Sequence, residues 1–160
     1  MLRRDSSRGF TLMELVVTLA LLGLLAMLAA PMAEVAVQRS REQALREALR
    51  EIRIAIDRYK AAADRGAIER SLGDTGYPPS LQALVDGVPN QKSPNKEMQY
   101  FLRRVPRDPF APVSGQAAAQ SWQLRSYVSP PDAPAPGADV YDVFTSASGN
   151  GLNGVPYREW

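Results

Sequence analysis

The stretch Gly9-Phe10-Thr11-Leu12-Met13-Glu14 decides the fold of this chain. It follows a short basic leader and opens an apolar run, residues 10–30, in which Glu14 is the only charged side chain. A helix of that length spans about 32 Å, and the hydrocarbon core of a bilayer is about 30 Å thick. The run therefore predicts one membrane-spanning helix.

The position of Glu14 inside this run predicts a functional role. A carboxylate costs about 2.5–3.5 kcal/mol at the bilayer centre and less near its edge, so acids in membrane helices usually serve function. The alternatives are an ordinary signal anchor or a secretory signal peptide, but neither gives a reason for the glutamate. The run is also long for a signal peptide, and residues 20–36 contain no Ala-x-Ala cleavage pattern.

The spacing Gly-Phe-x-x-x-Glu resembles the N-terminal signal of type IV pilins and type II secretion pseudopilins. In that family a prepilin peptidase cuts after the glycine and methylates the new terminal phenylalanine, and the glutamate guides assembly. The resemblance implies cleavage between Gly9 and Phe10, methylation of Phe10 and an assembly role for Glu14.

Composition narrows the function further. The chain has 160 residues and a net charge of +2, and it contains neither cysteine nor histidine. Disulfides, thiolate chemistry and histidine-based catalysis are therefore excluded. Removing residues 1–9 leaves 16 basic and 16 acidic side chains (19 − 3 and 17 − 1), interleaved along the chain. A neutral mature chain gives no reason to expect nucleic acid as a partner.

Residues 32–65 are predicted to form an amphipathic helix that continues from the first one past Pro31, where a bend is permitted. One apolar stripe recurs at steps of three and four residues, and we expect it to dock on the chain's own C-terminal part rather than form a coiled coil. Glu42 and Arg46 have a spacing that supports a helix by a few tenths of a kcal/mol. The stripe consists of Leu45, Leu49, Ile52, Ile56, Tyr59 and Ala63.

Beyond Gly66, the predicted end of the helix, the elements are short. Ser80 is expected to cap a helix over residues 81–86 that ends at Gly87, and residues 88–96 are expected to form a loop. Alternating side chains predict strands at residues 122–128 and 140–145. The expected fold class is α+β: a long helix packed on a small antiparallel sheet, with a leader (1–9), an assembly helix (10–31), an amphipathic helix (32–65) and a globular part (66–160).

The C-terminal part resembles the major pseudopilins of type II secretion. The resemblance lies in Tyr77-Pro78-Pro79, in residues 100–110 with their Pro-Arg-Asp-Pro-Phe ending, in the two predicted strands and in Trp160. In that family a glycine-rich loop usually binds calcium through aspartates and carbonyl oxygens. Here residues 146–154 contain no carboxylate, so we expect no metal or other cofactor, because calcium usually needs carboxylates.

Without an ion, this loop needs another source of order. We expect the apolar groups of Leu152, Val155, Tyr157 and Trp160 to hold the tail on the sheet.

Asp139 and Asp142 are the remaining pair that could suggest catalysis. Residues three apart on a strand point to opposite faces, so turn and strand-surface roles are favoured over paired catalytic acids. Together with the resemblance to the pseudopilins, this implies a structural subunit and not an enzyme.

The resemblance implies a single-pass protein of the bacterial inner membrane, with a cytoplasmic N-terminus and a periplasmic domain. Its implied partners are other copies of itself, other pseudopilins, prepilin peptidase and the secretion platform. The alternatives are a pilin of a type IV pilus or of a DNA-uptake system, and a signal-anchored binding protein that never polymerises.

Overall fold

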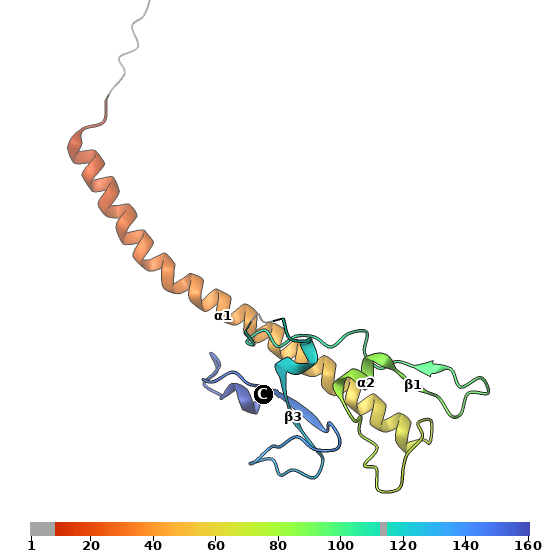
Figure 1. Ribbon diagram of the computed structural model, residues 1–160. Coiled ribbons are helices and arrows are strands. Elements are labelled where there is room, and N and C mark those ends of the chain that lie inside the picture. Colours follow the sequence, from red (N-terminus) through yellow and green to blue (C-terminus); the bar gives the residue numbers. More distant parts are fainter. Residues whose placement is uncertain (1–8, 113–114) are drawn as a thin grey trace, which may run out of the picture. The chain divides into compact units, whose positions relative to one another are not determined.

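The computed structural model describes residues 9–112 and 115–160, without the side chains of residues 28–30. It divides into two units, Met1–Arg39 and Ser40–Trp160, each considered by itself below. Helix α1, Leu12–Asp64, begins in the first unit and ends in the second (Figure 1). Residues 1–8 of the predicted leader lie outside the described part of the chain.

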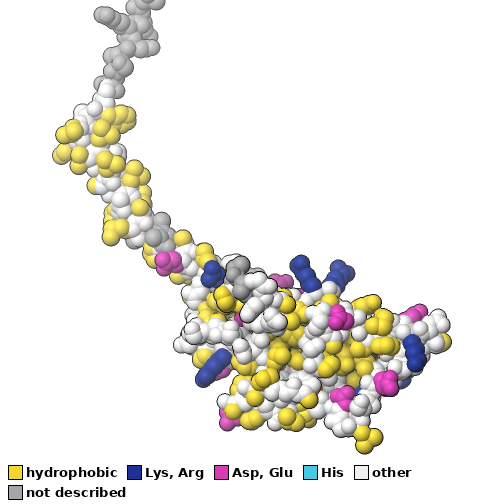
Figure 2. All heavy atoms as spheres, viewed as in Figure 1, with side chains coloured by type: hydrophobic (Ala, Val, Ile, Leu, Met, Phe, Trp, Pro, Cys, Tyr) yellow, Lys and Arg dark blue, Asp and Glu magenta, His cyan; other side chains and the backbone are white. Residues whose placement is uncertain are grey.

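In the first unit, the described side chains of α1 form an apolar surface that other described residues leave uncovered. Its large apolar side chains are exposed, from Leu12 at 82% to Val37 at 54%, and Figure 2 shows them along this helix. By length and composition α1 could cross a membrane. Pro31 lies inside the helix, as the sequence allows. An exposed apolar surface of this extent needs a bilayer or other protein to cover it.

In the second unit, α1 buries the predicted stripe. Every member of the stripe is at most 7% exposed, and Ala48, Ala55 and Ala62 widen it on the same face. The prediction that the stripe docks on the chain's own C-terminal part is confirmed. The principal members of the shared core are Leu45, Leu49, Ile52, Ile56, Tyr59, Leu81, Leu84, Phe101, Leu102, Trp122, Val143 and Tyr157.

Helices α1 and α2 (Leu81–Asp86) are capped by the residues that the sequence predicts. After α1, the N–H of Ala67 bonds to the carbonyl of Ala62 and that of Gly66 to Ala63, both at 2.9 Å, with Gly66 at φ +71°. This pattern is a Schellman cap, whose left-handed residue favours glycine. Helix α2 starts where the Ser80 hydroxyl accepts the N–H of Ala83 at 3.2 Å, and it ends at Gly87.

The main sheet consists of two antiparallel strands, β3 (Trp122–Arg125) and β4 (Asp142–Thr145). Leu124 lies opposite Val143, which is fully buried against the helix stripe. The expected α+β class is confirmed. The 3₁₀ helices η1 (Ala118–Ser121) and η2 (Tyr157–Glu159) flank these strands in sequence.

Both strands are shorter than the sequence predicts, because tertiary hydrogen bonds replace the ladder at one end. The N–H of Tyr127 bonds to the carboxylate of Asp139 at 2.8 Å, and the N–H of Ser126 bonds to the carbonyl of Ala135. The N–H of Val140 bonds to the carbonyl of Pro78 at 2.8 Å. These donors are therefore not available for further pairing between β3 and β4.

The prediction of a loop at residues 88–96 is wrong at its start. Val88–Pro89 forms β1, which pairs with β2, Met98–Gln99, as a second antiparallel ribbon. Two-residue strands are too short to show alternation, and a proline argues against a strand in sequence. Strand β1 forms nevertheless, because it pairs with β2, about ten residues further along the chain.

The C-terminal tail is held by fewer apolar side chains than expected. Tyr157 is buried and its ring lies 4.6 Å from that of Phe110 and 5.1 Å from that of Trp160. Leu152 and Val155, however, are 45% and 38% exposed, so these two do not pin the tail. The aromatic pair at positions 157 and 160 is what packs on the rest of the unit.

Replacing Trp160 with alanine is expected to lower the melting temperature of the second unit. Its ring contacts Tyr157, and Arg46 lies 4.2 Å above the ring. Losing a partly buried indole and this cation–π contact costs about 2 kcal/mol. The control is Tyr100→Ala, which removes an aromatic side chain that is 64% exposed. Thermal unfolding followed by circular dichroism compares the two; equal melting temperatures would contradict the packing role.

Candidate functional site

The N-terminal motif lies at the start of α1, where local capping sets its geometry. The N–H of Glu14 donates to the Thr11 hydroxyl at 3.2 Å, and the N–H of Leu15 donates to the Thr11 carbonyl at 3.1 Å. Thr11 is thus the N-cap of a helix that begins at Leu12. Thr-x-x-Glu is a known capping sequence, so the pattern at residues 11–14 could have revealed this role before the structure did.

Glu14 itself is exposed and lies in the first turn of the helix. An acid there is stabilised by the partial positive charge of the helix N-terminus, by about 0.3–1 kcal/mol at an exposed site. This local benefit is smaller than the cost of placing a carboxylate deep in hydrocarbon. Capping alone therefore does not explain the charge if the helix enters a bilayer or a packed bundle.

Gly9 and Phe10 precede the helix, and neither packs against a described part of the fold. Phe10 is 75% exposed, and a Cβ added to Gly9 would meet no atom within 4 Å. Within the described part of the chain, no contact requires glycine at this position.

The two aspartates that could suggest catalysis have structural partners. Asp139 accepts hydrogen bonds from the Thr75 hydroxyl and, at 2.8 Å, from the N–H of Tyr127. Asp142 accepts from Arg53 Nε at 2.8 Å, an ion pair that joins β4 to α1. The two carboxylates therefore bind different segments, as the strand-surface prediction implies.

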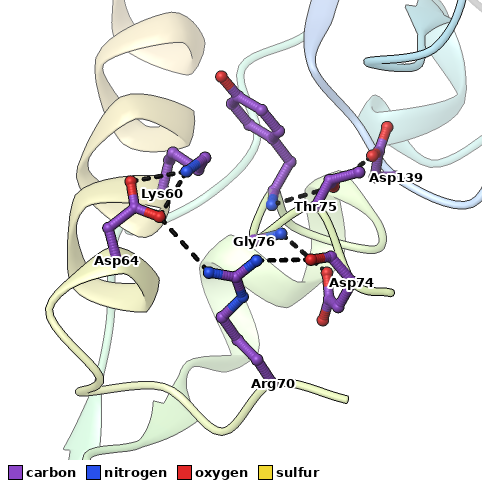
Figure 3. A network of polar contacts seen from close by, with 8 residues as sticks. Lys60, Asp64, Arg70, Asp74, Thr75, Gly76 and Asp139 are labelled. Carbon is purple, nitrogen blue, oxygen red and sulfur yellow. Dashed lines mark hydrogen bonds and ion pairs between the residues drawn. The ribbon is translucent and has the colours of Figure 1, made fainter. Parts of the chain in front are cut away.

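Asp139 belongs to a wider network of polar contacts between the end of α1 and the loop before α2 (Figure 3). Asp64 pairs with Lys60 at 2.5 Å and with Arg70 at 3.6 Å, and Arg70 also donates to the carbonyl of Asp74. Asp74 in turn accepts the N–H of Gly76 at 2.9 Å. These contacts hold the loop before α2 in place, and each carboxylate labelled in Figure 3 has a hydrogen-bond or ion-pair partner.

Three tyrosines form a second cluster in this unit. The rings of Tyr77, Tyr127 and Tyr141 lie 5.0–5.6 Å apart. Burial raises the pKa of Tyr77, and the neighbouring Tyr141 and Tyr127 hydroxyls and then Asp57 and Asp64 add to the rise. A phenol with a raised pKa stays neutral at physiological pH, so Tyr77 is a packing group rather than an activated nucleophile.

Comparison with known proteins agrees with this site. Residues 4–30 match the family described as the prokaryotic N-terminal methylation motif. The N-terminal part of the chain is thus similar to proteins that carry this motif ahead of an apolar helix. The match includes Gly9, Phe10 and Glu14.

The similarity continues beyond the motif. The chain is 29% identical over 118 residues to the type II secretion system core protein G of Klebsiella michiganensis, covering 68% of this chain and 72% of that protein. No solved structure matches the chain. The resemblance to the type II secretion pseudopilins is confirmed by the motif and by this similarity together.

Proposed function

We propose that this chain is a structural subunit of the pseudopilus filament of a type II secretion system. Prepilin peptidase cleaves it between Gly9 and Phe10 and methylates the new N-terminus. The observation that carries the proposal is the apolar run of residues 10–30, which is exposed wherever the structure describes its side chains. Its one acid, Glu14, stands five residues after Gly9, where a Cβ would meet no described atom within 4 Å. The similarity to a core protein G supports the same assignment.

The exposed helix explains why such a subunit needs two environments. Before assembly, the bilayer covers its apolar side chains, and the basic leader keeps the N-terminus in the cytoplasm. In the filament, the helices of other copies cover the same surface. The globular unit then lies on the periplasmic side, where other pseudopilins and the secretion platform are its partners.

Glu14 selects the register of that assembly. In an apolar bundle an unpaired carboxylate is costly, whereas a carboxylate paired with a fixed cation costs much less. The methylated amine of Phe10 on an adjacent subunit is the cation that cleavage creates. Only the register that brings the two together avoids the penalty.

An intact mass of the membrane-extracted protein tests the proposal. The expected mass is that of residues 10–160 with one added methyl group. Gly9→Leu is expected to keep the leader attached, because a large side chain fills space that a peptidase needs, while a Cβ at this position meets no described atom within 4 Å. Gly23→Ala is the matched control, since Gly23 is equally uncrowded but lies inside α1.

A mature protein that retains the leader in cells with an active prepilin peptidase contradicts the proposal. That result would favour a signal-anchored protein that does not polymerise. Equal processing of the Gly9→Leu and Gly23→Ala variants would contradict the cleavage position.

A further inference from the structure

The carboxylate of Glu42 lies buried within the second unit. Its side chain is 2% exposed although it belongs to α1, whose neighbouring positions 41, 43 and 44 are exposed. Arg46, one turn further along, approaches it at 3.6 Å but is itself 52% exposed. Charged side chains are almost never fully buried unless they are paired. The single long ion pair does not account for this burial.

Two further partners of Glu42 come from the C-terminal tail. Glu42 Oε1 accepts the N–H of Leu152 at 2.8 Å and the hydroxyl of Tyr157 at 2.9 Å. Leu152 turns its backbone N–H towards the carboxylate while its side chain is 45% exposed. Hydrogen bonds to a carboxylate are about twice as strong as neutral ones. The glycine-rich loop is therefore folded around an anion that belongs to the chain.

Other contacts from α1 hold the end of the same tail. Arg53 Nη2 donates to the carbonyl of Trp160 at 2.8 Å and to that of Val143 at 3.2 Å. The Trp160 ring packs so closely on Gly151 that a Cβ there would lie 2.3 Å from Cζ2. The tail is thus fixed to α1 at both ends of residues 151–160.

The same loop does not fit a calcium ion. Calcium takes six to eight oxygen ligands, several of them usually carboxylates. Here carbonyl oxygens of the loop and of Val155 just after it accept hydrogen bonds from the same tail: the carbonyl of Gly149 from Tyr157 (3.1 Å), that of Gly151 from Gly154 (2.8 Å) and that of Val155 from Gly151 (2.9 Å). Asn153 Oδ1 accepts the N–H of Val155 at 3.1 Å. Among the described residues, no three acidic, histidine or cysteine side chains are grouped for a metal.

We propose that Glu42 is an intramolecular ligand that orders the glycine-rich loop in place of a cation. Its carboxylate binds inward-facing donors of residues 152 and 157, so the tail is ordered equally with and without divalent cations. A cation-binding loop presents oxygens to its ion, whereas this loop presents an N–H and a hydroxyl. The inference concerns folding of the second unit and does not depend on filament assembly.

Hydrogen–deuterium exchange of the full-length protein in detergent micelles tests this inference. The readout is the exchange of peptides from residues 146–160 in millimolar calcium and in chelator. The wild-type tail is expected to exchange at the same rate in both. Glu42→Ala is expected to accelerate exchange of these peptides about tenfold, because both donors lose their acceptor. Added calcium is expected not to restore protection.

Glu47→Ala is the matched control, since Glu47 is an exposed acid on the same helix. If Glu42→Ala unfolds the whole unit, Tyr157→Phe decides the matter, because it removes one donor and keeps the ring on Phe110. It is then expected to accelerate tail exchange alone. Faster wild-type exchange in chelator, recovery of Glu42→Ala in calcium, or unchanged exchange in both variants would overturn the proposal.

Discussion

Glu14→Ala is expected to leave cleavage and methylation intact and to abolish filament assembly. The substitution keeps the apolar helix and the Gly9-Phe10 boundary at which we propose that prepilin peptidase cuts. It removes the charge whose pairing in an apolar bundle we propose selects one register of the subunits. Sheared filaments, quantified against membrane-bound subunits, are expected to fall at least about tenfold, since a lost paired charge is worth more than 1.4 kcal/mol.

Two further variants separate assembly from capping. Thr11→Ala removes the hydroxyl that caps the helix, at a cost of about 1 kcal/mol to the helix end, and is expected to assemble. Glu14→Gln keeps the shape of the side chain and the cap but not the charge, and is expected to fail like alanine. If Glu14→Gln subunits form filaments at the wild-type level, the pairing role of the carboxylate is wrong.

Ile52→Asp is expected to unfold the second unit completely. The substitution is made in a fragment that begins at Val35 and so omits most of the exposed apolar helix. Without the substitution, this fragment is expected to be soluble, folded and largely monomeric. Ile52 is fully buried in its core. Loss of the side chain costs about 2–5 kcal/mol, and burying an unpaired charge adds several more. The sum is comparable with the whole stability of a domain, about 5–15 kcal/mol.

Ile54→Asp is the control for this prediction. Ile54 lies two residues away on the same helix and is 42% exposed, so the charge remains in water. Circular dichroism and thermal melting are expected to show a folded Ile54→Asp fragment and an unfolded Ile52→Asp fragment. A folded Ile52→Asp fragment would mean that the stripe serves partner helices rather than the chain's own core.

Several features of the fold could be predicted because their causes are local. The stripe from Leu45 to Ala63 repeats at helical spacing, so the buried face of α1 is readable from residue order. Ser80 and Gly87 bound α2 through contacts within a few residues. The apolar run with its single acid likewise needs no tertiary information, and the matched methylation motif covers it.

The pairing and length of the strands could not be predicted from local sequence. Strands β1 and β2 have two residues each, and nothing in either segment predicts that Val88 will pair with Gln99. The ends of β3 and β4 are set by donors that bind Pro78, Ala135 and Asp139 instead of the opposite strand. A strand's length depends on which distant acceptor its N–H groups meet, and this is a property of the folded chain.

By itself, the sequence determined the apolar helix with its Gly-Phe-x-x-x-Glu motif, the buried stripe and the α+β class, because periodicity and spacing encode them. Only the tertiary structure decided the role of Glu42. In sequence it is one more acid at an i,i+4 spacing from Arg46, which normally means an exposed pair. Its two tail partners lie 110 and 115 residues away along the chain. A charged side chain can be buried when donors from distant parts of the sequence bind it, and a local sequence pattern does not reveal such donors.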